Sequence, residues 1–276
     1  MALGRHGYGK SQVRVVKVTR TPGRHVLRDL TVDVGLEGDF SAAHTSGDNS
    51  ALLATDTMRN VVYALARTDP IDSLESFGAA LVQHFLAAGP TVTRARIDIA
   101  EHPWERLADH EHAFQRGHGG TRTVTVIGDG EAMTYEAGID DLLVLKTTAS
   151  GWEGFVRDEY TTLPETDDRI FATIVTARWT YSTAPDEQEW QAVRATLLDA
   201  FGDHYSPSVQ FTLNRMGEAV IERHPGVEHI HLSMPNRHHL LFDLERFGLD
   251  NPNLVFQATT EPAGLIEGTI ERSPAL

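Results

Sequence analysis

Apolar and polar residues alternate along several stretches of this chain, and this spacing predicts strands. Leu30, Val32, Val34 and Leu36 alternate with polar or small residues, as in a strand with one buried face. An earlier apolar stretch, residues 13–18, is predicted to pair with it. Other predicted strands lie at residues 92–99, 121–127, 142–148, 170–181, 227–232, 239–244 and 265–270.

Helical spacing separates these strands in each half of the chain. In the first half, Met58, Val61, Val62 and Leu65 make one apolar stripe, and a second helix is predicted to start at Ser73. In the second half, apolar stripes run over residues 190–201 and 209–220. The Ser206-Pro207 pair is predicted to start the later helix, with the serine as the cap and the proline at the first position.

The two halves therefore repeat one order of elements: two strands, two helices, two strands. This order predicts an α+β protein with two tandem antiparallel-sheet domains, residues 1–138 and 139–276, each with two helices on one face of its sheet. The uncovered sheet faces and edges predict oligomerisation.

Composition narrows the possible functions. The 276 residues carry 24 basic and 39 acidic side chains, a net charge of −15, and this argues against nucleic acid or an anionic membrane as partner. Cysteine is absent, which excludes disulfides and thiolate chemistry. The start of the chain does not resemble a signal peptide, no apolar run is long enough to span a membrane, and the final residues are not a Ser-Lys-Leu peroxisomal tail. We therefore expect a cytoplasmic protein.

Three regions could carry chemistry. His102, His110 and His112 lie close together, but their spacing fits no strong zinc pattern, and loop or capping roles are expected. The segment 144–169 mixes aromatic, hydroxyl and charged residues in a way typical of a functional loop. Helix starts offer unpaired N–H groups to an anion, and Gln210, Thr55 and Asp56 are predicted near two of them. The residues alone nevertheless favour ordinary capping by Thr55 and Asp56 and an exposed side chain at Gln210.

In SMPNRHHL, residues 233–240, Asn236 and His238 stand two apart. In a strand this spacing places both side chains on one face and directs His239 to the other.

Together these motifs resemble the urate oxidase (uricase) family over nearly the whole chain. The resemblance rests on YGK at 8–10, ATDT at 54–57, VLKTTASGWEGFVRDEYTTLPETDDR at 144–169, SVQ at 208–210, LSMPNRHHL at 232–240, DNPNLVF at 250–256 and GLIEGTIER at 264–272. It implies a tunnelling fold (T-fold) and a homotetramer with active sites at subunit interfaces. It also implies oxidation of uric acid by O₂ and water to 5-hydroxyisourate and hydrogen peroxide, with neither metal nor organic cofactor.

The resemblance also implies roles for ten residues, of which nine follow the family pattern. Arg169 and Gln210 resemble the clamp that grips the planar substrate, with Val209 and Leu163 as apolar walls. Asn236 resembles the residue that holds oxygen above the ring. Thr55 and the backbone of Asp56 resemble groups that reach the substrate from a neighbouring subunit. The family's proton relay corresponds to Lys10, Thr55 and His238.

One position departs from the family pattern. Trp152 stands where the family usually carries a phenylalanine stacked on the purine ring. A tryptophan can also stack, with more area, but it is wider. Phe155 is expected to pack within the loop. Two alternatives stay open: another tunnelling-fold purine or pterin enzyme, such as GTP cyclohydrolase or pyruvoyl-tetrahydropterin synthase, or a urate-binding tetramer without catalysis.

Overall fold

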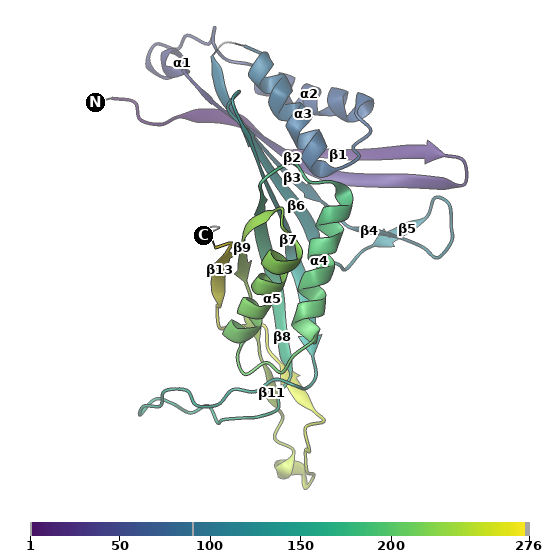
Figure 1. Ribbon diagram of the computed structural model, residues 1–276, viewed down its shortest axis with the longest axis vertical. Coiled ribbons are helices and arrows are strands. Elements are labelled where there is room, and N and C mark those ends of the chain that lie inside the picture. The colour runs from purple at the N-terminus through teal and green to yellow at the C-terminus, as the bar shows by residue number, and fades with distance from the viewer. Residues whose placement is uncertain (1, 90, 274–276) are drawn as a thin grey trace. The chain divides into compact units, whose positions relative to one another are not determined.

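A computed structural model of the protein describes residues 2–89 and 91–273 (Figure 1). Residues 274–276, which belong to the tail considered above, lie outside the described part. The chain divides into two compact units. Residues 2–139 and 179–191 form the first, and residues 140–178 and 192–273 form the second. The predicted domains, residues 1–138 and 139–276, were each one continuous segment. Each compact unit instead contains two segments of the chain, so the domain boundary at residue 138 stays a prediction.

The first unit is an antiparallel sheet with two main helices. Strand order within it is β1-β2-β3-β6-β7. Helix α3 packs on β3 and β6, and α2 packs on β1. The elements in chain order are β1 (Gly7–Thr21), β2 (Arg24–Gly38), α1 (Ser41–Thr45), α2 (Thr55–Thr68), α3 (Leu74–Ala87), β3 (Val92–Glu101), the hairpin β4 (Trp104–Arg106) and β5 (Phe114–Arg116), β6 (Thr121–Gly128), and β7 (Met133–Lys146), which continues into the second unit.

The core of the first unit follows the predicted pattern. Val32 and Leu36 of β2 are buried on the helix-covered side, as are Phe77 and Leu81 of α3. The helix predicted to start at Ser73 begins at Leu74, and Ser73 is its cap, accepting a hydrogen bond from the Ser76 backbone N–H at 3.0 Å. The apolar face and the cap therefore act together to define this helix.

The second unit repeats the arrangement. Its strand order is β7-β8-β9-β13, and β10 also pairs with β8. Helix α5 packs on β9 and β13, while Phe201 of α4 contacts Phe171 of β8 with ring centroids 5.3 Å apart. The elements are β8 (Phe171–Tyr181) and α4 (Glu187–Gly202), which both include residues of the first unit, then α5 (Val209–Arg223), β9 (Val227–Ser233), β10 (Asn236–Arg237), the pair β11 (His239–Leu241) and β12 (Phe256–Ala258), the short 3-10 helix η1 (Glu245–Phe247), and β13 (Glu267–Glu271).

Two predicted boundaries were wrong. The strand expected to start at Leu142 begins at Met133, and the one expected to continue to Leu244 ends at Leu241. Asn251 explains the second difference, because its side-chain amide donates to the Phe242 carbonyl at 2.8 Å and replaces a continued strand ladder with a turn. None of the described helices is long and apolar enough to cross a membrane.

Candidate active site

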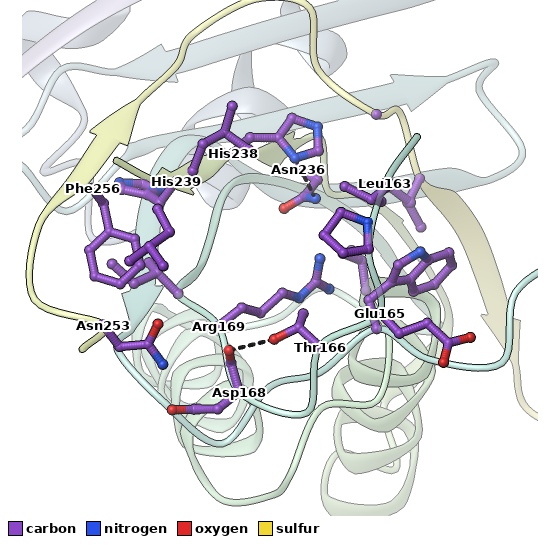
Figure 2. Close-up of a pocket in the computed structure, with 18 of the residues that line it drawn as sticks. Leu163, Glu165, Thr166, Asp168, Arg169, Asn236, His238, His239, Asn253 and Phe256 are labelled. Atoms are coloured by element: carbon purple, nitrogen blue, oxygen red, sulfur yellow. Dashed lines mark hydrogen bonds between the residues drawn. The ribbon is translucent and has the colours of Figure 1, made fainter. Parts of the chain in front are cut away.

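A cavity of about 620 Å³ opens in the second unit (Figure 2). Its walls come from the loop between β7 and β8, the start of α5, the segment 236–241, and the segments that lead to β12 and β13. Seven of the ten residues singled out by sequence line it: Trp152, Leu163, Arg169, Val209, Gln210, Asn236 and His238. The fold thus gathers into one cavity residues up to 86 positions apart, from 152 to 238.

Arg169 extends into the middle of this cavity in Figure 2. Its Nε donates a long 3.4 Å hydrogen bond to Ser150 Oγ. Its Nη2 is buried and has no hydrogen-bond partner among the described residues. Burial lowers the pKa of the Arg169 guanidinium, but an arginine stays charged at any ordinary pH. A buried cation with a free donor favours an anion that accepts hydrogen bonds.

Gln210 and Val209 enter the cavity from the first turn of α5. The predicted cap was wrong by two residues: Ser208, not Ser206, is the N-cap, and its Oγ accepts from the Phe211 N–H at 3.1 Å. The Ser206 hydroxyl is otherwise engaged, because it donates to the Ser208 carbonyl at 3.0 Å. Gln210 therefore lies at the positive end of the helix dipole, as the first-turn placement required.

Asn236 and His238 both line the cavity, the shared side that alternation predicted, although the strand ends at Arg237, before His238. The distance from Asn236 Nδ2 to His238 Nδ1 is 3.4 Å. Pairing of β10 with β8 holds Asn236 opposite Thr173, and the Asn236 N–H donates to the Gly264 carbonyl at 2.8 Å. His239 was expected to point elsewhere, but it lines the same cavity (Figure 2). The strand ends at Arg237, so strict alternation does not continue to His239.

Trp152 lies in the irregular loop, where its backbone pairs with Thr166 through hydrogen bonds of 2.7 and 3.1 Å. The indole stacks on Phe155 with centroids 5.6 Å apart and planes 12° apart. Phe155 is not among the residues that line the cavity. This contact agrees with the loop-packing role expected of Phe155. Leu163, 49% exposed, faces the cavity from the end of the same loop.

Lys10 belongs to the first unit, at a bulge in β1. Its strand partner is Val34, and the register shifts before Val13, which pairs with Val32. The extra residue Gln12 has a φ of 58°, and its N–H donates to the Asp33 carboxylate. Because of this bulge, Lys10 lies on the same face of the sheet as Val13, although the two are three residues apart.

The other residues of the YGK motif have structural roles in the first unit. The Tyr8 hydroxyl accepts a 2.7 Å hydrogen bond from the Leu53 N–H, two residues before Thr55. Gly9 passes so close to β2 that an added Cβ would lie 1.9 Å from the Val34 carbonyl oxygen. These contacts hold the start of β1 against the segment that leads into α2.

Thr55 and Asp56 are the first two residues of α2, and both are exposed. The alternative that they cap this helix was wrong, since the cap position is Ala54 and no side chain caps the end. Asp56 pairs instead with Arg59 at 2.8 Å. The Thr55 hydroxyl therefore has no capping duty within the described part of the chain.

The histidine-rich segment has structural contacts. His102 Nε2 shares a 2.8 Å hydrogen bond with Thr31 Oγ1, and the His110 N–H donates to the Leu107 carbonyl at 3.0 Å. Over residues 2–89 and 91–273, no group of three or more His, Asp or Glu side chains is placed to hold a metal ion.

Comparison with known proteins identifies the family. The Uricase family model matches residues 6–127 and 135–267. This chain belongs to the uricase family. The uricase of Arthrobacter globiformis is 48% identical over 274 residues, covering 99% of this chain and 90% of that protein. The uricase of Dictyostelium discoideum is 43% identical over 276 residues, covering 96% of each.

The solved structures agree. A crystal structure of the Arthrobacter globiformis uricase superposes with a TM-score of 0.95 at 47% identity, covering 100% of this chain and 96% of that one. The resemblance predicted from the motifs is thereby confirmed, as are the α+β tunnelling fold and the assignment to an enzyme of the urate oxidase type. The alignment with the Arthrobacter globiformis uricase covers almost the whole length of this chain.

Several residues of the cavity were missed by the sequence reasoning. Glu165 and Asp168 belong to the quoted loop motif, and Asn253 and Phe256 belong to the quoted DNPNLVF motif. These four residues thus lie in motifs that indicated the family, but the motifs gave no sign that the four line the cavity. The two carboxylates have partners of their own: Glu165 Oε1 accepts from the Gly154 N–H at 3.1 Å, and Asp168 Oδ1 accepts from Thr148 Oγ1 at 2.8 Å.

Proposed function

We propose that this member of the uricase family oxidises urate with O₂ and water to 5-hydroxyisourate and hydrogen peroxide, without a metal or organic cofactor. The observation that carries the proposal is Arg169, which lines the cavity and whose Nη2 is buried with no partner among the described residues. Urate is an anion at neutral pH, planar, with adjacent C=O and N–H groups. A guanidinium fork and the Gln210 amide complement such an edge.

Substrate would be held between groups of different character. Trp152 would stack on the purine ring, and Val209 and Leu163 would cover its apolar edges. The Gln210 amide would also place the anion near the positive end of α5. Asn236, 9% exposed, would hold O₂ and later peroxide or water above the ring.

The proposed chemistry needs proton transfer before electron transfer. Loss of a further proton makes the purine electron-rich, so that it gives two electrons to O₂, which leaves as hydrogen peroxide after taking up two protons. Water then adds to the oxidised ring. His238 lies 3.4 Å from Asn236 and is placed to pass a proton to or from the oxygen species. The proposed relay is completed by Lys10 and Thr55.

Lys10, Thr55 and Asp56 belong to the first unit, whereas the cavity lining comes from the second. We therefore propose that the relay is completed when copies of the chain assemble, with Lys10 and Thr55 of the partner subunit reaching His238. A homotetramer with sites at subunit interfaces would be the working enzyme. Thr55, exposed and free of any capping duty, is available for this contact.

The test is oxygen uptake by purified, chelator-treated protein supplied with urate, with peroxide release and loss of the urate ultraviolet band followed in parallel. Uptake matched by peroxide supports the proposal. Lys10→Met and His238→Gln should abolish turnover while urate binding under argon persists, because relay groups are not needed for binding. Urate bound but not consumed by the unaltered protein would indicate a binding protein. Equal loss of binding and turnover in both variants would refute the relay.

A further inference from the structure

Arg169 and Gln210, the two arms of the proposed clamp, come from segments far apart in the chain. Arg169 ends the loop after β7, and Gln210 lies in the first turn of α5. Their guanidinium and amide can grip one planar edge only if the spacing between the two segments is fixed to a fraction of an ångström. The contact between these segments therefore decides how well the clamp is formed before substrate arrives.

A backbone bridge joins the two segments directly. The Gly151 N–H donates to the Ser206 carbonyl, and the Ser206 N–H donates to the Ala149 carbonyl, each at 2.8 Å. Ser150 and Ser206 are the paired residues, and both are fully buried. The two segments also approach too closely for a side chain at Gly151, where an added Cβ would lie 2.2 Å from the Tyr205 hydroxyl. The contact is therefore tight and specific.

On the loop side, Ser150 contacts the clamp arginine itself. The Arg169 N–H donates to the Ser150 carbonyl at 2.8 Å, and the Arg169 Nε donates to the Ser150 hydroxyl at 3.4 Å. Ser150 thus holds Arg169 both at its backbone and at its guanidinium. Because Nε donates to Ser150, the N–H donors on Nη1 and Nη2 are left for a ligand.

On the helix side, buried hydroxyl groups connect Ser206 to the first turn of α5. Thr212 Oγ1 donates to Ser206 Oγ at 2.7 Å, and Ser206 Oγ donates to the Ser208 carbonyl at 3.0 Å. Thr212 Oγ1 also shares a 2.9 Å hydrogen bond with His204 Nε2. Ser206 and Thr212 are fully buried, so water cannot replace these bonds without a rearrangement. The chain of bonds surrounds Ser208 and Val209, immediately before Gln210.

We propose that Ser150, Ser206 and Thr212 are positioning residues that fix the spacing between Arg169 and Gln210 and so set the affinity for urate. None of the three lines the cavity, so they act through the clamp and not by touching substrate. The proposal rests on the proposed function, since it assumes that the two arms grip urate.

The test compares Ser206→Ala, Ser150→Ala and Thr212→Val, which remove hydroxyls while keeping size nearly constant, with Thr212→Ser, which keeps the hydroxyl. Urate affinity is measured by calorimetric titration under argon, and KM and kcat are measured in air. The three deletions should each raise Kd and KM by about threefold to tenfold, because Ser150→Ala breaks one hydrogen bond and each of the other two breaks two. Because the clamp grips substrate and transition state alike, kcat should change by less than about twofold. Thr212→Ser should stay within about twofold of the unaltered protein in all three constants.

Ser73→Ala is the matched control. Ser73 is also buried and caps a helix start through a 3.0 Å bond, but it lies in α3 of the first unit. It should lower thermal stability without changing the Kd of urate. Wild-type Kd and KM in the deletion variants, or shifts no larger than that of Ser73→Ala, would overturn the inference while leaving the proposed function intact. Failure of the unaltered protein to bind urate would overturn both. If Ser206→Ala does not fold, Thr212→Val and Ser150→Ala decide the question.

Discussion

Replacing Arg169 by methionine should change stability and binding in opposite directions. The Arg169 Nη2 is buried without a partner among the described residues. An unsatisfied buried donor destabilises a fold by about 1–3 kcal/mol. Methionine has nearly the same length and no donor, so Arg169→Met should raise the free energy of unfolding by about 1 kcal/mol or more. For a chain of this size, that corresponds to about 2–4 °C in Tm.

The same substitution should almost abolish urate binding. Two charge-assisted hydrogen bonds contribute about 1.5–3 kcal/mol each. Their loss corresponds to roughly a hundredfold to ten-thousandfold weaker binding. Saturating urate should raise the Tm of the unaltered protein, because a ligand stabilises the state that binds it, and should leave the Tm of Arg169→Met unchanged. Both quantities can be measured in one series of thermal unfolding scans under argon, where urate is not consumed.

Arg178 supplies the control within the same unit. Its guanidinium holds both carboxylate oxygens of Asp140, at 2.7 and 2.8 Å, and it does not line the cavity. Arg178→Met should therefore lower Tm and leave urate affinity unchanged. A fall in the Tm of Arg169→Met similar to that of Arg178→Met would show that Arg169 is satisfied in the free protein. Retention of urate affinity in Arg169→Met would refute its place in the clamp.

Three further predictions concern other parts of the chain. Trp152→Phe should change the KM for urate less than about threefold because a stacking ring remains, whereas Trp152→Ala should raise it at least about tenfold; equal KM values in the two variants would exclude stacking. Arg122→Met should destabilise the protein by about 3–5 kcal/mol in denaturant unfolding, because the fully buried Glu75 loses the partner that holds it at 2.7 Å. Adding Glu75→Gln to the Arg122→Met chain should restore part of the lost free energy of unfolding. Burial raises the pKa of Glu75 above its ordinary 4.5, although the charge of Arg122 opposes this shift. The stability contributed by protonation of Glu75 is therefore fully present below pH 4.5 and is lost as pH rises through the folded-state pKa. The Tm of Glu75→Gln relative to the unaltered protein should therefore increase as pH rises from 4.5, and a constant difference would contradict the assignment.

The strands and helices could be predicted because their signals are local. The alternation in β2 and the stripe and serine cap of α3 each depend on neighbours within one element. The errors arose where a side chain has a partner elsewhere. Ser206 looked like a cap, but its hydroxyl is engaged by Thr212 and Ser208, which leaves Ser208 to cap α5. No local pattern distinguishes the two serines.

The candidate site was predictable to the extent that motifs could name its residues. Helix-start and alternation arguments drew attention to Gln210, Asn236 and His238, but resemblance alone gave these three and Arg169 their roles. The fold brings the four together. Periodicity did not predict that proximity, because it depends on the Ser150–Ser206 bridge and on the pairing of β10 with β8. Both are long-range contacts. The bridge joins two irregular segments, and β10 is only two residues long, so neither contact has a periodic signal of its own.

The proposed function predicts a selectivity for the cavity that depends on which of its polar groups already have partners. Glu165 and Asp168 are acidic, but their carboxylates accept hydrogen bonds from Gly154 and Thr148. Among the described residues that line the cavity, the buried side-chain atom without a partner is the Arg169 Nη2. A ligand that neutralises this cation relieves a penalty that the free protein bears, whereas a neutral purine of the same shape leaves the cation buried and unpaired. From the proposed function we therefore expect discrimination between the two to come from the unpaired charge rather than from the size of the cavity.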